Sequence, residues 1–172
     1  MLRHFGHARV AVLDGGLRAW RALEGGESPP VELGDFVAAE PTSGAVVDYE
    51  FVRRLDGDVL LLDARGRDRF RGEVAPGDPR TGRIPGAKSA YWEAVNLDDE
   101  GRFLPPNVLR QRYAQLGVGR FPETVVYCGS GVQACHVLLG MEIAGLAGKL
   151  YPGSWSDWSR HPDAPAEKDT EP

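Results

Sequence analysis

Cysteine is scarce in this sequence, and the two cysteines present, Cys128 and Cys135, lie seven positions apart. One pair cannot form the disulfide framework of a small secreted domain, and its spacing is not that of a Cys-x-x-Cys redox pair. The spacing does not suit zinc ligands either, and the histidines show no paired arrangement. The sequence therefore predicts no metal site and a cytoplasmic, reducing location.

Long apolar runs and basic clusters are also missing. No segment approaches the roughly 18 uninterrupted apolar residues of a membrane span, and the first residues lack the apolar stretch of a signal peptide. The net charge is −5 and no Lys/Arg cluster offsets it, which argues against a nucleic-acid partner. The 42% hydrophobic content is enough for the core of one domain of ordinary size. We therefore expect no membrane and no nucleic-acid partner.

A short unit of strand, glycine turn and tryptophan-containing helix occurs twice. Residues 10–13 predict a short buried strand and residues 17–23 a brief helix, and the stretch 149–158 repeats the pattern. Chance similarity of so short a unit is the alternative. If the repeat is real, residues 1–24 are the last strand and helix of an N-terminal domain related to the one that follows.

The remaining chain divides into a linker, a regular domain and a tail. Residues 25–44 are rich in proline and lack periodicity, which is typical of an interdomain linker. Residues 45–160 alternate between strand and helix patterns, and we expect the proline-containing, charged residues 161–172 to be disordered. The strands are expected at 59–63, 87–91, 125–127 and 149–151, and the helices at 48–55, 106–116 and 132–144. Such alternation predicts an α/β domain with a mainly parallel central sheet and helices on both faces.

The stretch 125–139 organises this domain, because three β-formers lead into a cysteine, a glycine-rich loop and an apolar helix pattern. Cys128 ends the strand and faces the amides that open the next helix, where unpaired N–H groups and the helix dipole favour a thiolate. Gly129 and Gly131 allow those amides to converge on one point. The alternative is a buried cysteine with a purely structural role, and the two glycines disfavour this alternative. Asp63 also ends an apolar strand, so its loop is expected at the same rim.

The neighbours of this cysteine limit its chemistry. A cysteine-dependent phosphatase needs an arginine six positions after the cysteine, and Ala134 stands there. We expect Cys135 in the core and His136 in a structural role. Ser130 either lends its hydroxyl to the site or is an ordinary loop serine.

Residues 128–135 closely resemble the active-site loop of rhodanese-type sulfurtransferases. Further matches, in the same order as in the catalytic domain of the two-domain members, are at 62–65, 69–72, 78–80, 84–87 and 153–158. Residues 5–7 and 12–16, with Trp20, resemble the end of the inactive N-terminal domain. The resemblance covers about residues 2–158. It implies a rhodanese-like, three-layer α/β domain.

The resemblance implies that Cys128 takes the outer sulfur of thiosulfate or 3-mercaptopyruvate as a persulfide. The persulfide then passes to a thiophilic acceptor, cyanide or a thiol, with no metal or organic cofactor. The loop residues that would stabilise the persulfide are Gly129, Ser130, Gly131, Val132, Gln133 and Ala134. Arg69 and Arg80 occupy the family positions that bind the anionic end of the donor. Arg65 is expected to order the rim through a carboxylate such as that of Asp63.

The uncharged loop resembles the mercaptopyruvate-preferring type, in which the serine, here Ser130, joins a proton relay. Gln133 and Arg83 depart from the usual threonine and histidine and leave the preferred donor open. Most of the first domain would be missing, so we expect weakened turnover and an exposed apolar patch that promotes self-association. The alternative function is a persulfide carrier or regulatory module that accepts sulfur from a partner protein.

Overall fold

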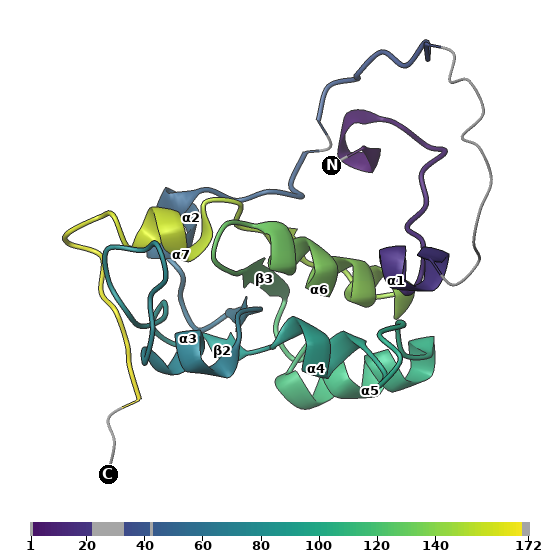
Figure 1. Ribbon diagram of the computed structural model, residues 1–172. Helices are drawn as coiled ribbons and strands as arrows, with labels where there is room; N and C mark the ends of the chain where they lie inside the picture. Colours follow the sequence, from purple (N-terminus) through teal and green to yellow (C-terminus); the bar gives the residue numbers. More distant parts are fainter. Residues whose placement is uncertain (1, 22–32, 42, 170–172) are drawn as a thin grey trace.

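The computed structural model describes residues 2–21, 33–41 and 43–169, and its strands and helices alternate along the chain (Figure 1). In chain order the elements are the short 3-10 helix η1 (Arg3–Phe5), α1 (Gly16–Arg21), α2 (Tyr49–Arg53), β1 (Val59–Asp63), α3 (Arg67–Arg71), β2 (Lys88–Ser89), α4 (Trp92–Asn96), α5 (Pro106–Leu116), β3 (Glu123–Tyr127), α6 (Val132–Ile143), β4 (Lys149–Leu150) and α7 (Ser154–Trp158). None of the helices in these described residues is long and apolar enough to cross a membrane.

The four strands form one parallel sheet in the order β2-β1-β3-β4. In the register of β1 and β3, Leu62 is opposite Val126 and Asp63 is opposite Tyr127. The two central strands therefore end level with each other, and the loops after Asp63 and Tyr127 leave from the same edge. This edge is where parallel α/β sheets place their sites.

Both faces of the sheet are covered by helices. Successive side chains of a strand point to opposite sides, so each central strand contributes to the core on both faces. Leu62 and Val126 pack with helices α4, α5 and α6, while Leu61 and Val125 pack with α2 and α7 on the other face. Figure 1 shows the two groups of helices on the two sides of the sheet. The predicted three-layer α/β domain with a parallel sheet is confirmed.

Two local signals have their expected geometry. The N–H of Phe51 donates to Asp48 Oδ1 at 2.8 Å, so Asp48 is the N-cap of α2. Gly117 ends α5 with a φ of 107°, a left-handed conformation that glycine adopts without strain.

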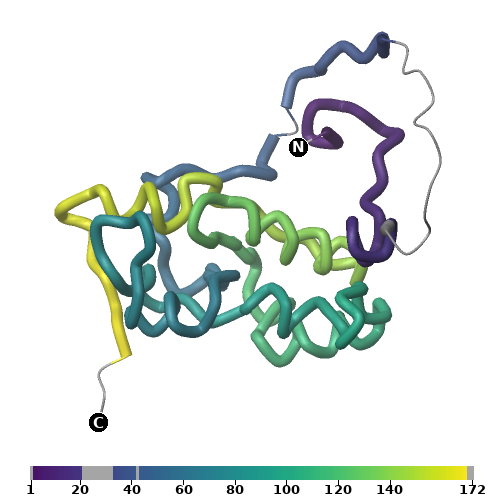
Figure 2. Tube along the Cα trace, viewed as in Figure 1, coloured from purple at the N-terminus to yellow at the C-terminus, as the bar shows by residue number. Residues whose placement is uncertain are grey.

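The prediction of a buried strand at 10–13 is wrong. These residues form no strand, and the side chains of Val12 and Leu13 are 65% and 49% exposed. A strand needs a neighbour to pair with, and none of the four strands of the described sheet pairs with this segment. Polar contacts hold it instead: the N–H of Phe103 donates to Asp14 Oδ1 at 2.9 Å, and Arg3 pairs with Glu142 of α6. Figure 2 traces this segment in purple, from the first described residues to α1.

The predicted helix at 17–23 is present as α1, and its last two positions lie outside the described residues. Of the predicted linker, residues 33–41 and 43–44 contain no helix or strand, and residues 25–32 and 42 lie outside the described part. The assignment of residues 1–24 to a separate domain stays a prediction.

The expected disorder of the tail is wrong for residues 161–169. The carbonyl oxygens of Ser159, His161 and Ala164 accept hydrogen bonds of 2.9–3.0 Å from the guanidinium of Arg80. Further along, Arg83 bonds to the side chains of Glu167 and Asp169. The polar composition of the tail complements two arginines of the domain, and this complementarity orders it. Residues 170–172 lie outside the described part of the chain.

Candidate active site

The sulfur of Cys128 lies where the sheet meets the start of α6. Cys128 follows the last residue of β3, and only 1% of it is exposed. The chain then curls back through Gly131, whose φ of 86° is left-handed, so that the Gly131 N–H donates to Cys128 Sγ at 3.1 Å. Gly131 is also the residue before α6, a helix of 12 residues. The sulfur therefore meets both a backbone N–H and the positive end of a helix dipole.

The back of the loop is fixed by the residues that open α7. The N–H of Trp155 donates to the carbonyl of Cys128, and the N–H of Ser156 donates to the carbonyl of Gly129, each at 2.9 Å. The Cys128 N–H itself donates to Ser154 Oγ at 3.1 Å, and Ser154 Oγ donates to the Tyr151 carbonyl at 2.9 Å. These bonds hold the two loop carbonyls on the side of α7.

Ser154 has a φ of 56°, the only positive φ of a non-glycine residue in the described part of the chain. Such a conformation costs energy and persists where the surroundings impose it. Here the side chain is completely buried, and its hydroxyl joins Cys128 to the turn at Tyr151. The strain thus belongs to the framework that positions Cys128.

A pocket of about 330 Å³ opens at this loop. Its walls are formed by Arg69, Pro76, Cys128, Gly129, Ser130, Val132, Gln133 and Ser156. Ser130 is exposed at the pocket, and the Val132 side chain is 74% exposed. Most of the predicted loop therefore lines one cavity together with the sulfur. Ala134 does not, because its side chain is buried in the core beneath α6.

Arg69 is the cation of this pocket. Its guanidinium lies against Gly129, where an added Cβ would be only 2.9 Å from Nη2, so a side chain at Gly129 would displace the arginine. Arg69 Nη2 donates to Asp78 Oδ2 at 3.1 Å, and the side chain is 24% exposed. Arg69 Nε is buried and has no hydrogen-bond partner among the described residues. Arg69 thus lies beside the cysteine loop, and its binding of the donor stays a prediction.

Asp78 and Ser156 were not singled out by the sequence analysis. The Asp78 side chain is 4% exposed, and it accepts from Ser156 Oγ at 2.7 Å as well as from Arg69. Both residues fall inside the matched motifs at 78–80 and 153–158. The only signal in the sequence is an acidic residue two positions before Arg80, and it does not indicate the contact with Ser156.

The structure does not bring Arg80 to the pocket. Its guanidinium nitrogens donate to backbone carbonyls of residues 158–164. These contacts anchor the segment after α7, and the binding of the donor by Arg80 stays a prediction.

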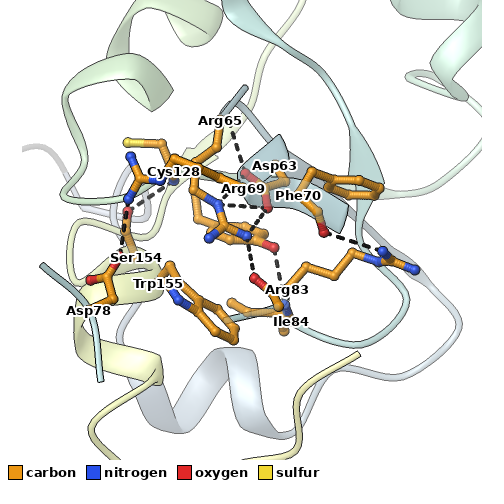
Figure 3. A network of polar contacts seen from close by, with 12 residues as sticks. Asp63, Arg65, Arg69, Phe70, Asp78, Arg83, Ile84, Cys128, Ser154 and Trp155 are labelled. Carbon is orange, nitrogen blue, oxygen red and sulfur yellow. Dashed lines mark hydrogen bonds and ion pairs between the residues drawn. The ribbon is translucent and has the colours of Figure 1, made fainter. Parts of the chain in front are cut away.

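The predicted pairing of Arg65 with Asp63 is present under the pocket (Figure 3). Arg65 Nη2 is 2.6 Å from Asp63 Oδ2, both side chains are almost fully buried, and Arg65 also donates to the Gly82 carbonyl. The guanidinium carbon lies 4.9 Å from the ring centroid of Trp155. Burial alone would lower the pKa of Arg65, but the hydrogen bonds and charge of Asp63 raise it above its ordinary value. The pair ties the end of β1 to the chain at Gly82 and to Trp155 of α7.

The two side chains that follow Ala134 differ from each other. Cys135 is exposed on α6, so its expected place in the core is wrong. His136 is structural, as predicted: its ring stacks on Phe103 at 4.6 Å, and Asn96 Nδ2 lies 3.0 Å from its Nδ1. Burial lowers the pKa of His136, partly opposed by the charge of Glu93.

Comparison with known proteins agrees with this geometry. A family model for the rhodanese-like domain matches residues 49–161. The chain is 46% identical to a probable 3-mercaptopyruvate sulfurtransferase of Pseudomonas aeruginosa, over 91% of this chain and 57% of that protein. It is 37% identical to a putative thiosulfate sulfurtransferase, SseB, of Mycobacterium tuberculosis, over 96% of this chain and 60% of that protein. It is 36% identical to the 3-mercaptopyruvate sulfurtransferase of Escherichia coli, over 97% of this chain and 61% of that protein.

The chain thus spans about three fifths of the length of these curated relatives (57%, 60% and 61%). Among solved structures it resembles an anaerobic ergothioneine biosynthesis enzyme from Chlorobium limicola bound to trimethyl histidine. The TM-score is 0.82 at 23% identity, with 98% of this chain and 43% of that chain covered. At this identity the likeness concerns the fold. The matched domain, the fold and the cysteine loop agree, and the chain belongs to the rhodanese-like family.

Proposed function

We propose that this protein is a sulfurtransferase that carries a sulfane sulfur as a persulfide on Cys128. The observation that carries this proposal is the position of Cys128 Sγ, which accepts the Gly131 N–H inside a pocket that also contains Arg69. A thiolate and a persulfide anion both gain from such an N–H, and an anionic donor gains from the arginine. The names of the curated relatives support a sulfurtransferase in general.

In the first half of the proposed cycle, the Cys128 thiolate attacks the outer sulfur of the donor. With thiosulfate the S–S bond breaks and sulfite leaves with the bonding electrons. With 3-mercaptopyruvate the C–S bond breaks, and the carbon that leaves takes up a proton to become pyruvate. Ser130 lies at this pocket and is the hydroxyl that we propose to exchange that proton.

In the second half, a thiol or cyanide attacks the outer sulfur of the persulfide, and Cys128 leaves as a thiolate. Cyanide gives thiocyanate, and a thiol gives a new persulfide. The chemistry balances without an oxidant, and we propose that no metal or organic cofactor takes part. The reducing, cytoplasmic location inferred from the cysteines is part of the same proposal.

A persulfide carrier is the second candidate function. One observation favours it: among the described residues that line the pocket Arg69 is the only cation, and Arg80 bonds to backbone carbonyls elsewhere. A carrier would receive its sulfur from a protein persulfide.

We also propose self-association through exposed apolar side chains of the first segment, where Val12, Leu17 and Trp20 are 65%, 71% and 61% exposed.

Thiocyanate formation from cyanide tests the proposed activity. Thiosulfate and 3-mercaptopyruvate are supplied separately to the unaltered protein, to Cys128→Ser and to the matched control Cys135→Ser. We expect thiocyanate from the unaltered protein and from Cys135→Ser, and none above background from Cys128→Ser. If neither donor reacts but a persulfidated partner protein loads Cys128, the carrier is the function; activity that survives in Cys128→Ser contradicts both candidates.

A further inference from the structure

The charge of the pocket is set by two residues. Of the pocket-lining residues in the described part of the chain, Arg69 is the only charged one. Directly behind it, Asp78 Oδ2 accepts from Arg69 Nη2 at 3.1 Å. The positive charge of Arg69, which a sulfur donor would meet in the pocket, is therefore already offset by the carboxylate of Asp78.

Asp78 is fixed in this position. Its side chain is 4% exposed, and its second oxygen, Oδ1, accepts from Ser156 Oγ at 2.7 Å. Each carboxylate oxygen thus has a partner that lines the pocket. Two such bonds hold the carboxylate in place.

In the described part of the chain, three other arginines have partners of their own. Arg65 is paired with Asp63, Arg83 with Glu167 and Asp169, and Arg80 with backbone carbonyls. One further donor is free: Arg69 Nε is buried without a hydrogen-bond partner among the described residues. The site can thus bind an anion through Arg69, but a second negative charge on that anion would face Asp78.

Ser156 adds a geometric reason. Its single hydroxyl hydrogen is donated to Asp78, so only lone pairs of Ser156 Oγ remain for the pocket. Lone pairs suit a donor that brings its own hydrogen, such as the S–H of a thiol. Lone pairs cannot donate a hydrogen bond, so they do not suit the additional oxygens of a sulfonate-like group.

On the basis of the proposed function, we infer that Asp78 is a specificity-determining residue that selects monoanionic sulfur donors over dianionic ones. A 2-oxo acid with a thiol, such as 3-mercaptopyruvate, carries one carboxylate and an S–H group. Thiosulfate carries two negative charges and no hydrogen. Asp78 acts through Arg69 and Ser156 by repelling the second charge and by keeping the Ser156 hydroxyl turned away from the donor.

The kinetic test compares both donors in Asp78→Asn and in Asp78→Glu, which retains the charge. In Asp78→Asn we expect the ratio of kcat/KM for thiosulfate to that for 3-mercaptopyruvate to rise about tenfold, mainly through KM for thiosulfate. Asp78→Glu should keep the ratio of the unaltered protein. An unchanged ratio in a folded Asp78→Asn, or an equal rise in Asp78→Glu, would overturn the inference.

A binding test separates this inference from the proposed function. Alkylation of Cys128 by iodoacetamide is followed by intact mass in Cys135→Ser, at equal ionic strength, with pyruvate or sulfate as the protecting anion. We expect pyruvate to protect better than sulfate, and Asp78→Asn in the same background to reduce that difference. Equal or better protection by sulfate in the Cys135→Ser protein overturns the role of Asp78. If neither sulfur donor loads Cys128, the proposed function fails, whereas the protection experiment still decides the role of Asp78.

Discussion

The loop of Cys128 and the first segment of the chain, residues 2–21, are held to the domain in different ways. The loop carbonyls accept backbone N–H groups from α7, and the Cys128 N–H is bound by a buried hydroxyl. The first segment is attached through polar contacts of Asp14 and Arg3, and several of its apolar side chains are exposed. A buried hydrogen bond is costly to leave unmade, while an exposed one can be replaced by water. Substitutions around the loop should therefore lower the free energy of unfolding strongly, and substitutions in the first segment only weakly.

Arg65→Ala should have the largest effect on stability. It would leave Asp63 as a buried, unpaired charge, and breaking such a pair costs about 3–5 kcal/mol. Urea unfolding measures the loss. Arg54→Ala is the matched control, because the Arg54–Glu50 pair is exposed, and it should cost less than about 0.5 kcal/mol. Equal losses in the two variants would contradict the role assigned to the buried pair.

Ser154→Ala should have an intermediate effect. It removes the acceptor of the Cys128 N–H, and a buried donor left without a partner costs about 1–3 kcal/mol. Ser154→Gly loses the same hydroxyl but removes the strain of the φ of 56°, so it should unfold at a higher urea concentration than Ser154→Ala. If the two variants unfold at the same concentration, the strain contributes nothing.

Asp14→Ala should have the smallest effect. The hydrogen bond from Phe103 to Asp14 is exposed, so its loss should change the free energy of unfolding by no more than about 0.5 kcal/mol. Sulfur loading of Cys128 should not change, while amide exchange at Phe103 should become faster. A loss of stability similar to that of Ser154→Ala would show that the first segment is part of the cooperative core.

The parts of the fold that were predictable are those with local signals. The apolar run at 59–63 and the helix that ends at Gly117 depend on residues adjacent in sequence, and both are present as expected. The strand expected at 10–13 failed because strand formation depends on a pairing partner that a local pattern does not reveal. Residues 161–169 looked disordered because their order comes from Arg80 and Arg83, 81–86 positions earlier.

The candidate site shows the same difference between local signals and contacts of residues distant in sequence. Cys128 and its glycines are encoded in one short stretch, and the expected N–H contact to sulfur is present. The contact of Asp78 with Ser156 joins residues 78 positions apart, and no local pattern indicates it. Arg80 shows the converse: its motif position predicts donor binding, whereas the contacts to carbonyl oxygens that surround it could not be seen in the motif.

The most direct test of the central claim is the intact mass of the protein after incubation with 3-mercaptopyruvate and removal of free donor. We predict a gain of one sulfur atom, located on the Cys128 peptide and lost again on addition of cyanide. The same gain should occur in Cys135→Ser and be missing in Cys128→Ser. A sulfur found on Cys135, or a gain that survives in Cys128→Ser, would contradict the account.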